Sequence, residues 1–182
     1  MKRQNVLKIT MVALMSSIIC ILAPLSIPIP FSIVPISCAT FAIYLTAAVL
    51  GAKLGTISVA IYILLGFVGL PVFAGWSAGA GVVIGPTGGY IFGYLLIAFF
   101  AGICMNKKNA STLRMAFGMV LGTIGCYTIG TLWLGMQLHL NVKEALMAGV
   151  IPYILGDVIK IILALLIIKP LRAQSYNRIM EM

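Results

Sequence analysis

Two long stretches of this chain carry no charged side chain. Residues 9–52 and 54–106 contain no Asp, Glu, Lys or Arg, and 62% of the whole chain is hydrophobic whereas only 8% is charged. Ordinary soluble domains carry about 25% charged residues, so this composition cannot supply the usual water-exposed surface. The apolar segments are also long enough to cross hydrocarbon, which takes about 20 helical residues. We therefore predict an all-α integral membrane bundle that forms a single domain over residues 1–182.

Prolines, glycines and polar clusters divide the apolar sequence into six predicted transmembrane helices. They fall at about residues 7–23, 36–50, 54–70, 88–105, 113–133 and 150–168, given the length that a helix needs to span a bilayer. The first of them follows Lys2 and Arg3, as the apolar core of a signal peptide would. Prolines and further spans follow it instead of a small-residue cleavage site and a polar domain, so we expect a retained helix.

The distribution of basic residues predicts the orientation in the membrane. Ten of the 12 lysines and arginines fall on one side of the six-helix arrangement: Lys2, Arg3, Lys8, Lys53, Lys107, Lys108, Arg114, Lys169, Arg172 and Arg178. Because positive residues stay cytoplasmic, both termini are predicted to lie inside, with ordered outer loops at residues 24–35, 71–89 and 134–149. This use of the positive charge leaves no role for nucleic acid and makes membrane lipid the expected partner of the basic side chains.

Asp157 and Lys160 lie inside the last apolar stretch. The chain has three acidic residues in all, and Asp157 is the one within an apolar run. A charged side chain near the bilayer centre costs about 2.5–3.5 kcal/mol on insertion scales, so such residues tend to face a bundle interior and mark function. Three positions apart on a helix, both side chains reach one cavity, about 8 and 12 Å below the outer helix end near Pro152. Tyr153 joins the same face, and Ala164 continues it inward.

A face that is polar near the outside and apolar toward the cytoplasm describes a pocket loaded from outside, and we expect the pair to contact a ligand. Three alternatives remain open from the residues alone. The pair could be an intrahelical salt bridge that closes the bundle core, Lys160 could reach a lipid headgroup, or the pair could couple transport to a proton or ion.

A glycine-rich segment precedes the fourth predicted helix. Six glycines fall within fifteen residues, and aromatic residues lie among them: Gly75, Gly79, Gly81, Gly85, Gly88 and Gly89, with Phe73, Trp76 and Tyr90. Glycine lets the backbone bend sharply and approach a ligand closely, and aromatic rings cover apolar ligand faces. We predict a lid or re-entrant segment over the pocket. The alternative is a flexible loop with an interfacial aromatic belt.

The run PVFAGWSAGAGVVIGPTGGY followed by IPYILGDVIK resembles the BioY family, the biotin-binding S components of energy-coupling factor (ECF) vitamin transporters. The resemblance extends over about residues 13–172 and includes FSIVPISCATFAIYLTAAVLGAKLGTISVAIYILLGFVGLP. GPTGGY and the Asp-x-x-Lys of the last helix are specific when they occur together. The chain departs from the family pattern at Ala39, where a glutamine is expected.

The resemblance implies a prokaryotic plasma-membrane protein with one outward-opening site that captures biotin. It implies no enzyme activity and no cofactor. Asp157 would accept hydrogen bonds from the ureido N–H groups, while Lys160 would offset Asp157 or pair with the biotin carboxylate. The substrate-binding residues implied in this way are Asp157, Lys160, Tyr153, Trp76, Phe73, Gly85, Thr87, Gly88, Gly89 and Tyr90.

Energy for uptake must come from partners, because the chain contains no G-x-x-x-x-G-K-[ST] phosphate-binding loop. The resemblance implies a transmembrane coupling protein and two cytoplasmic ATPases. Ala13 and Ser17 form a small-xxx-small stripe on the first helix, and the resemblance makes this stripe the docking site for the coupling protein. Packing within the bundle is the alternative for the same two residues.

Other classes of function find little support. The lone His139 and the dispersed Cys20, Cys38, Cys104 and Cys126 do not form a metal or redox motif. One acid and one lysine within the membrane are too few groups for most reactions. A small secondary carrier or facilitator that uses Asp157 and Lys160 as a coupling pair remains the second hypothesis.

Overall fold

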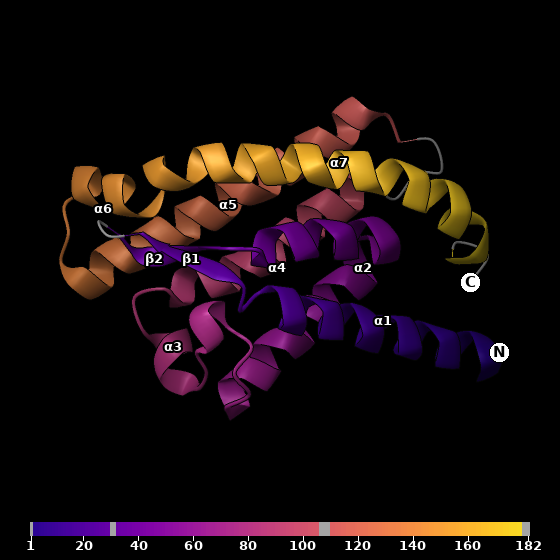
Figure 1. Cartoon of the computed structure of the whole chain (residues 1–182), viewed down its shortest axis with the longest axis horizontal. Helices are drawn as coiled ribbons and strands as arrows, with labels where there is room; N and C mark the ends of the chain where they lie inside the picture. The colour runs from indigo at the N-terminus through magenta and orange to yellow at the C-terminus, as the bar shows by residue number, and fades with distance from the viewer. Residues whose placement is uncertain (1, 30–31, 106–109, 180–182) are drawn as a thin grey trace.

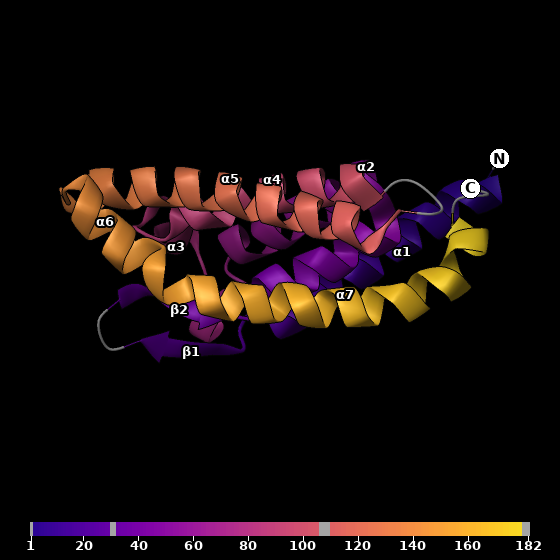
Figure 2. The same cartoon turned by 90° about the horizontal axis from the view of Figure 1, so that it is seen from above.

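The structure is a computed structural model that describes residues 2–29, 32–105 and 110–179, with side chains for residues 4–28, 34–105 and 110–170. Helices α1, α5 and α7 run along the long axis, and α1 begins at the end of the molecule where α7 finishes (Figures 1 and 2). The elements in chain order are α1 (Lys2–Leu22), β1 (Ser26–Ile29), β2 (Ser32–Ser37), α2 (Ala39–Val68), the 3₁₀ helix η1 (Ala74–Trp76), α3 (Ala80–Ile84), α4 (Gly88–Met105), α5 (Thr112–Leu138), α6 (Val142–Gly149) and α7 (Ile151–Ile179).

Helix α2 is two antiparallel arms joined at Gly51. The backbone of Gly51 has φ 71° and ψ −172°, which lies outside the helical region and in a region that favours glycine. A Cβ built on Gly55 would lie 3.4 Å from the Cα of Ala47, although eight residues of straight helix would separate the two by about 12 Å. The chain therefore reverses at Gly51, and the two arms correspond to the helices predicted at 36–50 and 54–70.

The proline-rich segment after α1, expected as an outer loop, forms an antiparallel hairpin. Strand β1 pairs with β2 in the register Ser26↔Ser37 and Ile27↔Ile36, with an irregularity at Pro28. Proline is tolerated here because a two-stranded sheet consists only of edge strands. The hairpin also moves the start of α2 to Ala39, later than the predicted residue 36. The hydroxyl of Ser37 accepts a hydrogen bond from the Ala39 N–H at 3.0 Å and so satisfies the first backbone N–H of the helix.

The ends of α5 and α7 differ from the predicted ones. Residues 134–149, expected as an outer loop, contain the last turn of α5 and the short helix α6, whose start is fixed by a capping box between Asn141 and Glu144. Helix α7 continues through Pro170, where the sequence predicted an end at residue 168. A proline removes one backbone hydrogen bond and kinks a helix without having to end it. The last turns of α7 bend toward the N-terminal end of α1 (Figures 1 and 2).

The described surface is that of a membrane protein. Large apolar side chains are exposed along the long helices, among them Leu64, Phe117, Leu155 and Ile162. Five helical segments of the described residues are long and apolar enough to cross a bilayer: Gln4–Leu22, Ala39–Val68, Gly88–Met105, Thr112–Leu138 and Val142–Pro170. Helix α2 counts once among them although it contains two arms. The predicted basic residues Lys107 and Lys108 lie outside the described residues.

Glycines let α4 and α5 pack closely against one another. A Cβ added to Gly93 of α4 would lie 2.8 Å from the Cα of Cys126, and one added to Gly122 of α5 would lie 2.7 Å from the Cα of Ile97. Both contacts involve backbone atoms, which cannot rotate away as a side chain can. The absence of a side chain at these positions therefore sets the distance between the helices, as small residues do at other transmembrane interfaces.

We predict that Gly122→Ala destabilises the bundle by about 1–3 kcal/mol, since the added methyl group forces α4 and α5 apart. Gly135→Ala is the matched control on the same helix, because a Cβ there meets its nearest atom at 3.6 Å, an ordinary contact distance. The control should be neutral or slightly stabilising. Thermal unfolding of the purified variants in detergent checks both, and equal stability of the two would contradict the packing argument.

Candidate functional site

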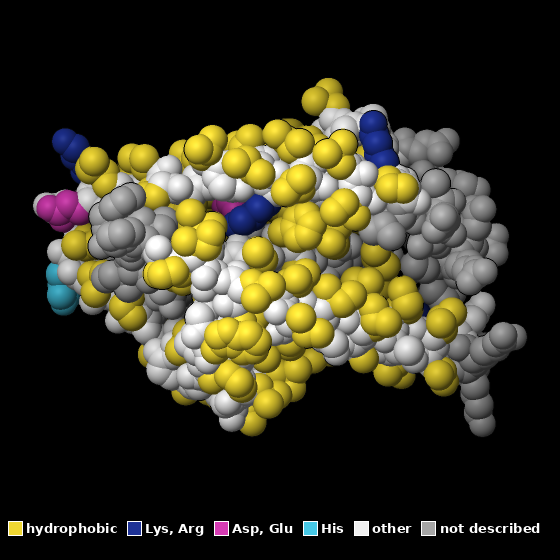
Figure 3. Space-filling view, in the orientation of Figure 1, with side chains coloured by type: hydrophobic (Ala, Val, Ile, Leu, Met, Phe, Trp, Pro, Cys, Tyr) yellow, Lys and Arg dark blue, Asp and Glu magenta, His cyan; other side chains and the backbone are white. Residues whose placement is uncertain are grey.

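The Asp157–Lys160 pair lies in the first third of α7 and forms an ion pair inside the bundle. Lys160 Nζ lies 3.0 Å from Asp157 Oδ1, and the two side chains are 15% and 9% exposed. Figure 3 shows an acidic and a basic side chain meeting in a hollow of an otherwise largely apolar face. Tyr153 and Ala164 of α7 are buried on the same side of the helix, as the spacing predicted.

Side chains from two further helices complete the surroundings of the carboxylate. The Thr40 hydroxyl at the start of α2 donates to Asp157 Oδ1 at 3.2 Å and accepts a hydrogen bond from Lys160 Nζ at 3.2 Å. The Tyr127 hydroxyl of α5 donates to Asp157 Oδ2 at 2.5 Å. Three donors therefore satisfy the buried carboxylate, which is the condition under which a buried charge is tolerated.

Two adjoining cavities lie at and next to this cluster. The smaller one, about 40 Å³, is bounded by Thr40, Tyr127, Tyr153, Asp157 and Lys160 among others. The larger one, about 330 Å³, lies beneath the segment between α2 and α4. The two cavities share four lining residues, namely Val34, Pro35, Tyr90 and Tyr94. The site is thus an elongated chamber with an ionic end at α7 and a wider end under η1 and α3.

The glycine-rich segment is an ordered wall of the wider cavity. Phe73, Gly85 and Thr87 line that cavity, and the Phe73 ring packs edge-on against Tyr62 at 5.6 Å between centroids. Helix α5 holds the segment in place: the Trp133 indole N–H donates to the Gly85 carbonyl at 2.9 Å, and the Gln137 side chain donates to the Ile84 carbonyl at 3.0 Å. The sequence predicted a lid over the pocket at Asp157 and Lys160, whereas this segment covers the adjoining larger cavity, whose lining includes no described residue of α7.

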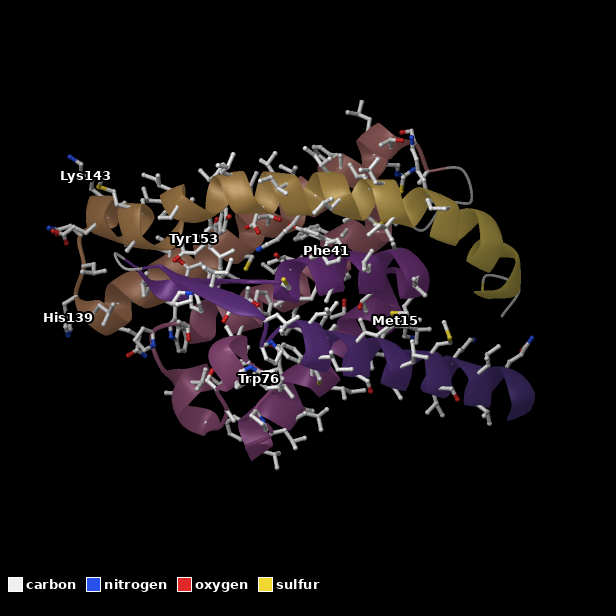
Figure 4. The ribbon with its side chains drawn as sticks, in the orientation of Figure 1. Met15, Phe41, Trp76, His139, Lys143 and Tyr153 are labelled. Atoms are coloured by element: carbon white, nitrogen blue, oxygen red, sulfur yellow. The ribbon has the colours of Figure 1, made fainter. Side chains whose placement is uncertain are left out.

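Three of the sequence-predicted residues do not line the chamber. Trp76 is 63% exposed with φ 61°, and in Figure 4 it lies near α3, apart from Tyr153 at the pair. Gly88 and Gly89 lie at the start of α4, where added Cβ atoms would meet the Val83 carbonyl at 1.9 Å and the Trp133 Cβ at 2.4 Å. In this structure these two glycines let the wall approach α4 and α5.

Tyrosines hold the middle of the chamber. The Tyr90 hydroxyl donates to the Gly149 carbonyl at 3.0 Å and so ties α4 to α6. Tyr153 donates to the Val34 carbonyl and ties α7 to β2. The sequence analysis missed Tyr94, which lines both cavities, although its position four residues after Tyr90 places both rings on one face of α4.

The geometry suits non-covalent binding of a small ligand with both polar and apolar parts. Among the described residues no group of three or more His, Cys, Asp or Glu side chains is placed to hold a metal ion. A chamber of a few hundred Å³ with mostly apolar walls and a few convergent polar groups is the common form of a small-molecule site.

Comparison with known proteins gives the family. The sequence model of the BioY family matches residues 1–177. The chain belongs to the BioY family. It is 41% identical to the biotin transporter BioY of Thermotoga maritima over 84% of this chain and 89% of the relative, and 34% identical to the biotin transporter BioY2 of Lactococcus lactis over 90% and 88%.

A solved structure extends this relationship to three dimensions. The crystal structure of the S-component for biotin from an ECF-type ABC transporter superposes on this BioY family member with a TM-score of 0.86. The two sequences are 33% identical, and the match covers 96% of this chain and 95% of the other. The resemblance found in the sequence is thereby confirmed.

We predict that Asp157→Ala destabilises this BioY family member by a few kcal/mol, because it leaves the Lys160 ammonium within the bundle without its counter-charge. Replacing both members, as Asp157→Ala with Lys160→Met, should restore most of the lost stability because no charge remains to be compensated. Chemical denaturation in detergent measures the cycle. A double variant as unstable as the single one would contradict the electrostatic explanation.

Proposed function

We propose that this chain is the biotin-binding subunit of an ECF-type uptake transporter, which captures biotin from outside and delivers it through an ATP-driven partner module. The chain acts as a substrate-binding subunit, and the chemical work of ATP hydrolysis belongs to its partners. The observation that carries the proposal is the superposition of nearly the whole chain on an S-component for biotin. It is supported by a chamber that has an ion pair at one end and a covering segment over the other.

The chamber supports binding of a molecule such as biotin. Its ureido–thiophane head and apolar chain need both hydrogen-bonding groups and ring-sized apolar walls, and Phe73, Tyr90 and Tyr94 supply such walls. An ionised carboxylate has about four lone-pair positions, and Thr40, Lys160 and Tyr127 occupy three of them. The remaining position of Asp157 is available to a ureido N–H. Lys160 then offsets the charge of Asp157 or pairs with the biotin carboxylate.

We further propose six membrane spans with both termini cytoplasmic in a prokaryotic plasma membrane. Counting each arm of α2 as a span gives an even number of crossings. This agrees with the start of α1 and the last residues of α7 lying on the same side of the bundle (Figure 1). The excess of basic residues near that end supports the cytoplasmic assignment. The chamber then opens toward the outer side.

The partners in this proposal are a transmembrane coupling protein and two cytoplasmic ATPases. Ala13 and Ser17 lie on the exposed face of α1, whereas Ser16 lies on the buried face and donates to the Ser58 carbonyl of α2 at 3.0 Å. The Ser17 hydroxyl bonds the Ala13 carbonyl within its own helix at 3.0 Å. These two small residues lie on an exposed helix face, and the Ser17 hydroxyl is already hydrogen-bonded within the helix. Both features support close docking of a helix from another protein, in preference to packing within the bundle.

Asp157→Asn should weaken biotin binding by about tenfold or more, since an acceptor-only group gains an N–H among partners that already donate to it. Glu144→Gln is the control, because it neutralises the acid on α6 at the outer end of the molecule. Calorimetric titration of purified protein with biotin measures both. Unchanged affinity in Asp157→Asn and also in Lys160→Ala would place the site elsewhere.

Ala13→Leu should leave biotin affinity unchanged and abolish ATP-dependent uptake in vesicles that contain the partner module, because the larger side chain blocks close helix approach. Ile21→Leu, on an exposed position of the same helix, should preserve both activities. Biotin uptake that persists without the ATPases and collapses with the proton gradient would favour a secondary carrier instead.

A further inference from the structure

A third cavity, larger than the two that form the chamber, lies at the surface of the bundle. It has a volume of about 560 Å³ and runs between α5 and α7, with α6 at one end; Figure 2 looks onto these three helices. We call it the α5–α7 groove. Its lining residues, almost all apolar, are Val120, Thr123, Ile124, Tyr127, Thr128, Thr131, Leu132, Val142, Leu146, Val150, Ile154, Asp157, Val158 and Ile161.

The hydroxyl groups that reach the α5–α7 groove are already hydrogen-bonded within the protein. Thr123 and Thr128 each donate to the backbone carbonyl one turn earlier in α5, at 2.8 and 2.9 Å. Tyr127 donates to Asp157, and the Thr131 hydroxyl lies 3.3 Å from that of Tyr90. The groove therefore offers an occupant apolar contact and little hydrogen bonding, which favours a hydrocarbon chain over a polar solute.

The groove is continuous with the lipid-facing surface. Ile154 and Val158 of its own lining are 49% and 46% exposed, and the neighbouring Leu155 is 73% exposed. From Val120 to Leu132 it extends about 18 Å along α5, close to the roughly 15 Å of hydrocarbon in one leaflet of a bilayer. Hydrocarbon surrounds the long apolar helices at this depth, so a chain of about that length is the material available to fill the groove.

A basic residue lies at the α6 end of the groove. Lys143 stands next to Val142, which lines the groove, and Figure 4 shows Lys143 above α6, on the side from which Figure 2 views the groove. The neighbouring Glu144 is engaged in its own helix cap, where its carboxylate accepts from the Asn141 N–H at 3.0 Å. An exposed lysine beside an apolar groove in the membrane complements the phosphate of a lipid.

We propose that the α5–α7 groove binds one anionic phospholipid, with an acyl chain between α5 and α7 and the phosphate at Lys143. Tyr127 and Asp157 line both the groove and the smaller cavity of the chamber. The bound acyl chain therefore forms part of the outer wall of the polar site and keeps water from the ion pair. Lipid binding in the α5–α7 groove goes beyond the proposed function, because it does not depend on which solute binds in the chamber.

The test fills the groove with side chains. Thr128→Phe with Ile154→Phe occupies the acyl-chain position, while Ile129→Phe with Leu155→Phe is the matched control on exposed, adjacent positions of the same helices. Each protein is reconstituted with phosphatidylglycerol and phosphatidylcholine, extracted in mild detergent, and its retained lipid is counted by native mass spectrometry. Monodispersity and thermal unfolding establish that each variant is folded.

Wild type and control should retain one phosphatidylglycerol per protein. The fraction of protein with bound lipid should fall at least about tenfold in the filled variant, which corresponds to 1.4 kcal/mol of binding free energy. Lys143→Gln should keep a bound lipid and lose the preference for phosphatidylglycerol. Equal retention in the filled variant and the control would overturn the proposal. The proposal would also fail if the filled variant retained lipid normally but no longer assembled with the partner membrane protein. In that case a helix of the partner, and not a lipid, would occupy the α5–α7 groove. Biotin titration of the same samples tests the proposed function separately.

Discussion

The Asp157 carboxylate is the point on which the architecture of the site depends. It accepts hydrogen bonds from α2, α5 and α7 through Thr40, Tyr127 and Lys160. A bare carboxylate at this position in a membrane would be costly, and these three contacts compensate it. The same contacts hold α2, α5 and α7 together around the two carboxylate oxygens of Asp157. The ionic end of the chamber therefore also stabilises the packing of these three helices.

The wide end of the chamber depends on packing instead of charge. The wall that covers it is held by carbonyl groups that accept from Trp133 and Gln137, and by the Phe73 ring, which lies against Gly66 and Tyr62. A Cβ on Gly66 would lie 2.1 Å from the Phe73 ring, so the ring fills the space that a side chain would take. An end fixed by an ion pair and a wider end shaped by aromatic packing suit a ligand with both polar and apolar parts.

Hydropathy and charge predicted the membrane class and the course of the helices, because burial in lipid selects long apolar runs. They also predicted the Asp157–Lys160 pair, which stands out as the one charged cluster within such a run. The β1–β2 hairpin, the capped helix α6 and the continuation of α7 through Pro170 were missed, since each depends on local backbone bonding that a proline-rich or polar stretch does not display. Thr40 and Tyr127 were missed for a different reason. A single hydroxyl in an apolar helix gives no sign of its partner, which lies 117 residues away for Thr40 and 30 for Tyr127.

The reversal at Gly51 gives α2 a mechanical role. Its second arm is bound to α1 through Ser16 and Ser58, and eight residues further along it carries Gly66, against which Phe73 rests. Eight residues of uninterrupted helix form a stiff rod about 12 Å long. The contact with α1 and the position against which the Phe73 ring packs therefore lie on one stiff arm of α2, and neither can shift along the bundle without the other.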